Sequence, residues 1–415
     1  MGMPLYQLHE TQRVLLAPMV RMADLFFTLL SNPLSPLSYT PLSRPASAGY
    51  GLFKRIAKEY TKPDWDIHTV HTEGVDVTVQ EQMMMQKPFC RLISFNRFSD
   101  DARSSKRMNH QPIVLLVAPL SGHHATLLRE TVRELLKDHQ VYITDWIDAR
   151  MIPLWMGPFH LSDYVEYIQE FIRFIGPEKT NIISVCQPTV PVLGALSLMA
   201  TAGESLPRKV IMMGGPIDPR KSPTTVNNLA TTRALSWFED NVIYRVPLCY
   251  PGIGRPVYPG FLQHAGFIAM NQERHMQSHY DYFLNLTRGN SDDAAAHCRF
   301  YNEYNAVLDI PAEYYLDTIK TVFQDFALPK GMWEVNGKLV RPQDISKTSL
   351  LTIEGKYDDI SGSGQTRAAH NLCTKIHDKN RAHLDVEAGH FGIFSGSRWR
   401  EDVYPVVRNF ISQRS

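Results

Sequence analysis

The chain has 415 residues, of which 44% are hydrophobic and 20% are charged, so it is long enough and apolar enough to bury a large core. Its 43 basic residues almost cancel its 42 acidic residues. This balance argues against a charge-driven nucleic-acid binder, and we expect no nucleic-acid partner.

Cysteine usage and the N-terminus predict a reducing compartment. The five cysteines are odd in number and contain no Cys-x-x-Cys pair, which argues against a disulfide framework and a zinc knuckle. Residues 1–19 lack the basic start, apolar core and cleavage site of a signal peptide. The longest uninterrupted apolar run, 113–120, has about 8 residues against the roughly 20 that cross a bilayer. We therefore expect a cytoplasmic protein without a transmembrane segment, and the pattern is compatible with a homo-oligomer.

The first elements differ from those that follow. Residues 20–30 have the spacing of an amphipathic helix, and the Ser/Pro-rich stretch 31–47 predicts a loop. Alternating patterns at 68–82 and 89–95 predict antiparallel strands at a sheet edge. Strands and helices then alternate as in a parallel sheet. The predicted strands are 113–118, 141–144, 181–185 and 209–213, and the predicted helices are 127–137, 161–175 and 190–201.

An aromatic-rich insertion interrupts this alternation after Gly214-Gly215-Pro216. The strand pattern resumes only at 349–353. We interpret the insertion as a helical cap over the sheet, in which most aromatic residues pack against each other and some contact a substrate. The aromatic residues considered are Trp237, Tyr250, Tyr258, Phe261, Tyr280, Tyr282, Phe283, Tyr301, Tyr304, Tyr314, Tyr315 and Trp333.

The pentad Ser184-Val185-Cys186-Gln187-Pro188 lies between a predicted strand and a predicted helix. It resembles the nucleophile elbow of α/β-hydrolases, where a strained turn lifts the reacting side chain above the sheet and requires small flanking residues. Ser184 and Pro188 stand where glycine is usual. Because a buried cysteine is more often a small hydrophobe, the pentad alone is a weak pattern.

Partners for a cysteine nucleophile follow in the required order of acid and then histidine. The stretch 355–359 comes after the strand that resumes beyond the insertion, and His390 comes after the next strand. Each candidate then stands at the carboxyl end of a strand, where open α/β sheets bind ligands. The acidic stretch could also form a plain turn, but the conjunction of types, order and position predicts a Cys186–Asp358–His390 triad. Asp358 is preferred to Asp359 because Gly-x-x-Asp is the usual acid-loop spacing of this fold.

These elements together predict an α/β-hydrolase fold, a mostly parallel sheet flanked by helices with a largely helical cap insertion. We divide the chain into an N-terminal extension (1–60), a first part of the hydrolase core (61–220), a cap or lid insertion (221–345) and a second part of the core (346–415).

The oxyanion formed during attack must be met by backbone N–H groups. The residue after the nucleophile, Gln187, supplies one, and we expect Leu120 or Ser121 to supply the other from the loop after strand 113–118. His123 and His124 in the same loop are metal-ligand and proton-relay types. No further ligands cluster with them in the sequence, so we expect no metal.

Four segments of the chain resemble the intracellular polyhydroxybutyrate depolymerases. The likeness extends over nearly the whole chain and includes the Ser-x-Cys-x-Pro form of the elbow. It implies that Cys186 is the nucleophile, Asp358 the acid and His390 the base. The segments are 6–13, 118–129, 141–146 and 184–189.

This resemblance implies breakdown of amorphous storage polyester at the surface of cytoplasmic granules, with the granule or an oligomer as partner and substrate. The Cys186 thiolate would attack a 3-hydroxybutyrate ester, release a hydroxyl-ended chain and pass its thioester to water or to the thiol of coenzyme A. Neither a metal nor a resident cofactor is implied.

Two alternatives stay open on the sequence. A polyhydroxyalkanoate synthase, which is an acyltransferase, joins the same fold to a Cys-Asp-His triad, but it normally shows Gly-x-Cys-x-Gly where this chain has Ser184 and Pro188. A non-catalytic granule-associated protein could also retain the fold. In that case, replacing Cys186 would leave granule turnover unchanged.

Overall fold

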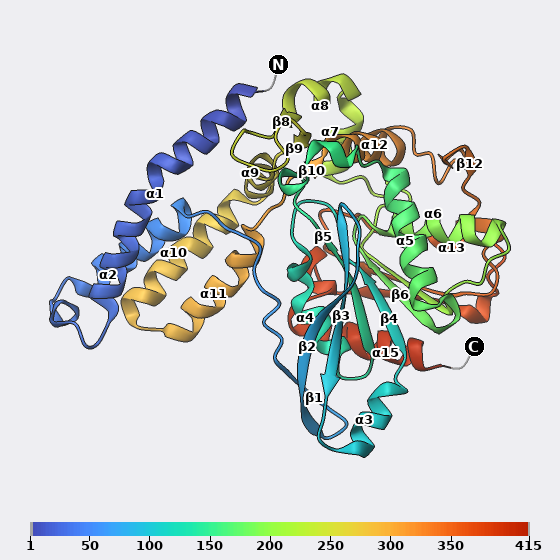
Figure 1. The fold of residues 1–415 in the computed structure, drawn as a ribbon, viewed down its shortest axis with the longest axis horizontal. Helices are drawn as coiled ribbons and strands as arrows, with labels where there is room; N and C mark the ends of the chain where they lie inside the picture. The colour runs from blue at the N-terminus through green and yellow to red at the C-terminus, as the bar shows by residue number, and fades with distance from the viewer. Residues whose placement is uncertain (1–2, 414–415) are drawn as a thin grey trace.

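The computed structural model of the protein describes residues 3–413 as a nine-stranded sheet between helical layers, with a helical arm projecting to one side (Figure 1). The strands are β1 (Thr69–Thr72), β2 (Val75–Gln86), β3 (Cys90–Phe98), β4 (Ile113–Val117), β5 (Gln140–Trp146), β6 (Thr180–Val185), β7 (Lys209–Met213), β13 (Ser349–Gly355) and β14 (Arg381–Val386). Their order is β1-β2-β3-β5-β4-β6-β7-β13-β14. The pairings up to β3–β5 are antiparallel, and those from β5–β4 to β13–β14 are parallel.

The central strands are apolar along their length because both faces of the sheet are covered. In β4, Leu115 and Val117 join one core while Val114 and Leu116 join the other, as the two-residue period of a strand requires. On the first face lie α5 (Leu161–Ile175), α6 (Thr189–Thr201) and α13 (Ala369–Leu372), and on the second lie α3 (Ala102–Asn109), α4 (Arg129–Leu135) and α15 (Tyr404–Ser412).

The predicted α/β alternation agrees with the structure, and one local difference has a clear cause. The stretch 68–82, where the alternating pattern predicts strand without indicating a turn, contains the β1–β2 hairpin. Glu73 and Gly74 form the turn with φ of +52° and +81°. Two successive residues with positive φ make the tight turn that suits the twist of a hairpin.

The arm begins with α1 (Met3–Ser31) and α2 (Ser43–Ala57), and α2 lies against α10 (Gln272–Arg288) of the cap (Figure 1). An added Cβ at Gly51 would lie 2.9 Å from the Phe27 ring and 3.3 Å from Leu286, so α1, α2 and α10 meet closely there. The expectation for this region is corrected in two respects. The first helix starts well before residue 20, and the predicted loop 31–47 includes the start of α2.

Helix α1 also corrects the expectation about apolar length. Its segment Leu5–Ser31 is long and apolar enough to cross a membrane. Little of this segment is buried inside the protein. The expectation rested on the uninterrupted run 113–120, whereas α1 includes a few polar residues. Length and composition do not assign a membrane location, since signal sequences and core helices share them.

The insertion between β7 and β13 forms a largely helical cap at the carboxyl ends of the parallel strands. Trp333 joins the cap to the core, where an added Cβ at Gly194 of α6 would lie 2.6 Å from its ring. The cap elements are α7 (Thr225–Thr232), α8 (Leu235–Val242), β8 (Tyr244–Arg245), β9 (Pro256–Tyr258), α9 (Gly260–Met270), α10, α11 (Ser291–Tyr304), β10 (Ile310–Pro311), α12 (Ala312–Thr318), β11 (Glu334–Val335) and β12 (Lys338–Leu339); the short α14 (Gly396–Arg398) follows His390 in the core.

Candidate active site

Cys186 lies on a strained turn between β6 and α6, in the middle of the sheet. Its φ is +69°, a conformation that costs about 1–3 kcal/mol for a residue with a side chain. The Cys186 N–H donates to the Met213 carbonyl at 2.7 Å, and the Thr189 N–H donates to the Cys186 carbonyl at 3.2 Å. An added Cβ at Gly215 would lie 2.5 Å from the Cys186 carbonyl oxygen. Neighbouring backbone thus holds the turn and leaves no room for a larger residue at Gly215.

Ser184 and Pro188 fit this turn without glycine. Ser184 is fully buried, and its hydroxyl donates to the Ile211 carbonyl of β7 at 3.3 Å. Pro188 has φ of −57° at the cap of α6, which is close to the value that a proline ring imposes. Local packing therefore explains the two departures from the usual glycine pattern.

His390 and Asp358 form a buried pair at the ends of β14 and β13. Nδ1 of His390 lies 2.7 Å from Oδ2 of Asp358, and both side chains are almost completely shielded from solvent. Oδ1 of Asp358 accepts hydrogen bonds from the N–H groups of Ile360 at 2.9 Å and Ser361 at 2.8 Å. The neighbouring Asp359 instead accepts a 3.4 Å hydrogen bond from an amide of the cap. Of the two adjacent carboxylates, Asp358 is the one that orients His390.

The charge state of His390 depends on both of its neighbours. Burial by itself lowers the pKa of His390, but charge and hydrogen-bond interactions with Cys186 and Asp358 outweigh burial and raise the pKa well above its usual value. Because Nδ1 is engaged with Asp358, Nε2 is the nitrogen left to face Cys186. The structure therefore brings together the three residues predicted from the sequence.

The predicted oxyanion donors lie beside Cys186. Parallel pairing of β4 with β6 sets the loop 118–124 next to the elbow. Leu120, Ser121 and Gln187 line the same cavity as Cys186. Within residues 3–413, the backbone N–H groups of these three residues donate to no protein acceptor. They are free to meet a developing negative charge.

A cavity of about 1010 Å³ opens over Cys186, between the strand ends and the cap. Only some of the cap aromatics line this cavity. Phe261, for example, packs against Tyr6 of α1 with ring centroids 5.4 Å apart. The predicted aromatic residues that do line the cavity are Tyr258, Tyr301, Tyr304, Tyr314 and Tyr315.

Two side chains near Cys186 carry polar atoms whose role the sequence does not indicate. The Tyr314 hydroxyl and both polar atoms of the Gln187 side chain are buried, line the cavity and form no hydrogen bond of good geometry among the described residues. The Gln187 and Thr318 side chains are the nearest polar neighbours of the Tyr314 hydroxyl. Leaving such a group unpaired costs about 1–3 kcal/mol, which a bound polar ligand would recover. No local pattern distinguishes Tyr314 from the other cap aromatics, because its missing partner is a tertiary property.

The two adjacent histidines of the 118–124 loop, His123 and His124, are both buried. Nε2 of His123 lies 3.1 Å from the Tyr304 carbonyl and its ring stacks on Phe267. Burial lowers the pKa of His123 to about 4 and that of His124 to about 3. Both rings are therefore neutral near pH 7, and His123 ties the loop to the cap.

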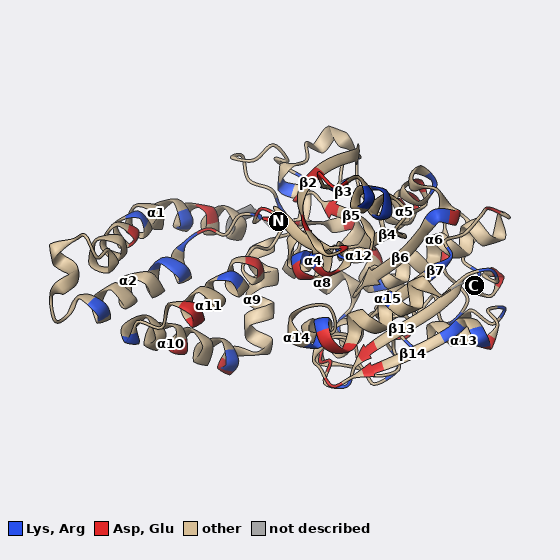
Figure 2. Ribbon diagram, turned by 90° about the horizontal axis from the view of Figure 1, so that it is seen from below, with Lys and Arg blue, Asp and Glu red and all other residues tan. Residues whose placement is uncertain are grey.

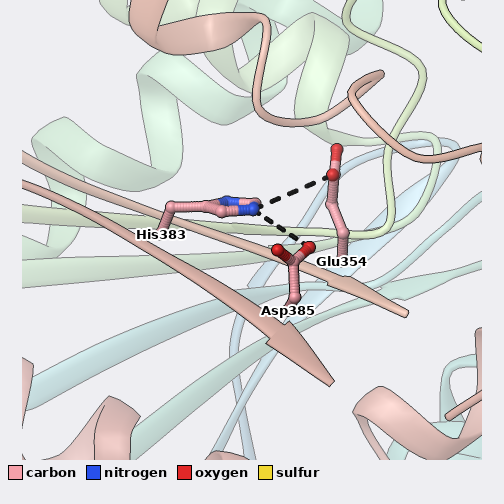
Figure 3. Close-up of side chains that lie close together, drawn as sticks. All are labelled: Glu354, His383 and Asp385. Atoms are coloured by element: carbon pink, nitrogen blue, oxygen red, sulfur yellow. Dashed lines mark hydrogen bonds and ion pairs between the residues drawn. The ribbon is translucent and has the colours of Figure 1, made fainter. Parts of the chain in front are cut away.

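A different trio, Glu354, His383 and Asp385, combines three potential metal-ligand side chains within the described residues (Figure 3). Nε2 of His383 lies 3.1 Å from Asp385 Oδ1 and 4.0 Å from Glu354 Oε2. Glu354 already accepts three backbone hydrogen bonds of 2.7 to 2.8 Å from N–H groups within 364–367. Glu354 therefore anchors the loop that begins at Asp358.

Comparisons with known proteins relate the chain to polyhydroxyalkanoate metabolism. Residues 214–415 match the family described as "PHB de-polymerase C-terminus". A relative, the poly(3-hydroxyalkanoate) polymerase subunit PhaC of Haloarcula marismortui, is 23% identical over 315 residues, an alignment that covers 73% of this chain. This chain spans only 61% of the length of that relative.

One similar solved structure is 2-hydroxy-6-oxo-6-phenylhexa-2,4-dienoate hydrolase from Rhodococcus sp. strain RHA1. It is 15% identical with a TM-score of 0.44, and the match covers 81% of this chain and 100% of that chain. Another is a thioesterase domain from the curacin biosynthetic pathway, 10% identical with a TM-score of 0.41 and the same two coverages. The mostly parallel sheet, the elbow after β6 and the cap after β7 define an α/β-hydrolase. The chain has an α/β-hydrolase fold, and its residues 214–415 are similar to the PHB de-polymerase C-terminal family.

Proposed function

We propose that this protein is an intracellular poly(3-hydroxybutyrate) depolymerase that cleaves amorphous storage polyester through a thioester on Cys186. The observation that carries the proposal is the cysteine on a strained elbow beside the buried His390–Asp358 pair, at the floor of a large aromatic cavity. The match of 214–415 to the PHB de-polymerase C-terminus family supports a polyester as the substrate class.

In the first half-reaction, Nε2 of His390 takes the proton of the Cys186 thiol, and the sulfur attacks the ester carbonyl carbon. The N–H group of Gln187, together with that of Leu120 or Ser121, stabilises the resulting oxyanion. Collapse of the intermediate breaks the carbon–oxygen bond, and the imidazolium protonates the departing alkoxide. Asp358 keeps the ring oriented and stabilises its positive charge.

In the second half-reaction, the acyl thioester is transferred to an acceptor. With water, His390 removes a proton during attack, and the products are a free carboxylic acid and the regenerated thiol. With the thiol of coenzyme A as acceptor, the product is a 3-hydroxyacyl thioester. Mass spectrometry of the products formed with and without coenzyme A distinguishes the two acceptors.

The cavity is suited to a polyester strand. Aromatic walls favour the methyl-bearing carbons of 3-hydroxybutyrate units, and a few polar groups are needed to orient the ester oxygens. The unpartnered Tyr314 hydroxyl and Gln187 side-chain amide are donors of this kind. The large volume leaves room for units on both sides of the scissile bond.

A synthase is the second candidate, because the PhaC relative is described as a polymerase subunit. Such an enzyme would transfer the same thioester to a chain-end hydroxyl instead of breaking the polymer. The packing of Ser184 and Pro188 supports the depolymerase, since the synthase pattern has glycine at both positions. Incubation of the purified protein with 3-hydroxybutyryl-CoA should give no polymer, and polymer formation would contradict our assignment.

The decisive experiment measures release of 3-hydroxybutyrate units from amorphous granules. Cys186→Ala should reduce release by about 10³-fold or more and keep granule binding. Cys249→Ala, which removes an exposed cysteine of the cap, is the matched control and should behave as wild type. Undiminished release by Cys186→Ala would support a non-catalytic granule-associated protein. Crystalline polymer should be a poor substrate.

A further inference from the structure

The N-terminal arm, defined as residues 5–57, presents an apolar face that the rest of the protein leaves uncovered. On α1, Leu8, Leu15, Met22 and Leu29 recur at every seventh residue and are 62%, 71%, 58% and 36% exposed. Residues at this spacing lie along one side of a helix. A continuous apolar stripe therefore follows most of the length of α1.

The same apolar surface continues beyond the helix. Leu34 and Leu42, in the segment that joins α1 to α2, are 92% and 75% exposed. Monomeric proteins rarely expose contiguous apolar surface on this scale unless the surface has a function. We call this surface, formed by the α1 stripe and the 32–42 segment, the arm face.

The arm is fixed to the protein by specific contacts. The Tyr6 hydroxyl donates to Oδ2 of Asp309 at 2.7 Å, and Nη2 of Arg55 donates to Oδ1 of Asn302 at 3.2 Å. Asn302 lies on α11, which also carries the cavity-lining Phe300 and Tyr301. The arm face and the wall of the catalytic cavity therefore belong to one packed layer of helices (Figure 1).

Charge indicates what kind of surface the arm face fits. From residue 14 to residue 43, Arg21 and Asp24 are the only charged residues, and Asp24 is paired with Lys54 of α2. Figure 2 shows the segment that joins α1 to α2 without charged residues, with a basic patch on α2 beside it. Helices that lie on anionic lipid carry a basic face or basic flanks. The arm face carries no basic cluster, although Arg44 follows it directly. Its composition therefore favours a surface that is apolar and has no charge.

A seam between two copies of α1 is the main alternative to a polymer surface. A two-helix seam requires apolar residues at two positions of each heptad. With Leu8, Leu15, Met22 and Leu29 at one position, the other position holds Leu5, Gln12, Met19 and Phe26, of which only Gln12 is polar. The test of the arm face therefore includes the oligomeric state of the protein.

We propose that the arm face docks the protein on the uncharged surface of amorphous polyester and thereby holds the catalytic cavity beside it. This inference rests on the proposed function, because it takes polyester as the substrate. An amorphous polyester surface is apolar and carries no fixed charge, and partial burial of leucine and methionine side chains in it releases ordered water.

The test compares two double variants of the arm face. Leu15→Glu/Met22→Glu and Leu15→Lys/Met22→Lys each place two charges on exposed positions of α1. Phe98→Glu/Phe174→Glu is the matched control, because it charges two exposed apolar positions on β3 and α5 of the core. Co-sedimentation with phospholipid-free amorphous granules and hydrolysis of soluble p-nitrophenyl butyrate are measured for each.

Both arm variants should bind granules roughly tenfold more weakly or worse, as expected when two leucine-sized side chains lose their burial. Their hydrolysis of the soluble ester and all properties of the control should stay unchanged. Unchanged granule binding by both variants would overturn the proposal.

Two other outcomes would also overturn it. If the wild type sediments with phosphatidylglycerol vesicles and the lysine variant binds them more tightly, the partner is anionic lipid. If analytical ultracentrifugation shows a dimer that both variants dissociate, the partner is a second copy. If the arm variants lose granule binding but wild type cleaves no polymer, docking stands and the depolymerase assignment fails.

Discussion

The cavity over Cys186 has two sides, a floor formed by the strand-end loops of the core and a roof formed by the cap. The two sides differ in how many of their buried polar groups have hydrogen-bond partners. On the floor, Asp358 accepts two backbone hydrogen bonds and one from His390, so the proposed acid and base are held in place before any substrate arrives. In the roof, the Tyr314 hydroxyl is buried without a partner. Preorganised groups lower the barrier to reaction, whereas unpaired buried groups gain most from a ligand. Floor variants should therefore change turnover, and roof variants should change substrate binding.

The largest effect should come from the floor carboxylate. Asp358→Asn should lower kcat on amorphous polyester by about 10²- to 10⁴-fold, because the amide cannot stabilise the imidazolium and can select the wrong tautomer of His390. KM should change little. Steady-state kinetics on granules and on a soluble ester both report the change.

Asp359→Asn is the matched control for that variant. It removes a carboxylate one residue away that lines the cavity without an ion pair to His390. Its kcat should stay close to that of wild type. If the two variants were equally impaired, the assignment of Asp358 as the acid would fail.

The next prediction concerns the sulfur on the floor. Interaction with Cys186 is one cause of the raised pKa of His390, so the two side chains are close enough for His390 to activate the sulfur. Iodoacetamide should therefore label Cys186 in a Cys249→Ser background faster than it does when His390→Gln is added, by about tenfold or more.

Peptide mapping identifies the labelled residue, and activity is followed in parallel. Inactivation should track modification of Cys186. Inactivation that instead tracked Cys90, Cys298 or Cys373 would contradict a catalytic role for Cys186. Equally fast labelling of Cys186 with and without His390→Gln would contradict activation of the sulfur by His390.

Tyr314 tests the roof. Tyr314→Phe keeps the ring and removes only the unpartnered hydroxyl, so the fold should be unaffected or slightly stabilised. Loss of one hydrogen bond to an ester oxygen should raise KM for oligomeric substrate about tenfold with kcat largely retained. Tyr258→Phe, at another cavity-lining tyrosine, is the comparison. A fall in kcat with unchanged KM would move Tyr314 from recognition to chemistry.

The contrast between floor and roof also explains which features the sequence could predict. Asp358 and His390 follow apolar strands, and strand ends are local signals whose spatial meeting follows from a parallel sheet. Helix α2 escaped prediction because Pro45, Gly49 and Gly51 disfavour a helix in isolation. Its stability comes from packing, since Gly51 allows the close approach of α1 and α10. No pattern in the chain could show that the Tyr314 hydroxyl lacks a partner.

The smallest effect concerns Asp309, a buried carboxylate outside the cavity that accepts from the Tyr6 hydroxyl of the arm and the Gly260 N–H of the cap. Burial, and then the neighbouring Asp148, raise the pKa of Asp309 despite the nearby Arg150. An aspartate whose pKa is raised by folding binds more protons in the folded state, so its contribution to stability falls as pH rises from about 4 through the raised pKa. Asp309→Asn removes this titration, while its amide can still accept from the Gly260 N–H and donate to the Tyr6 oxygen.

We therefore expect the stability of Asp309→Asn relative to wild type to increase by about 1 kcal/mol between pH 5 and pH 8, measured by urea unfolding at both values. Asp100→Asn, at an exposed position, is the control and should show no such increase. A relative stability that fell with rising pH would mean that the Asp309 carboxylate is stabilised by Arg150 and the Tyr6 hydroxyl more than it is destabilised by burial. The joint between the arm and the cap would then be an ordinary ion pair of Asp309 with Arg150.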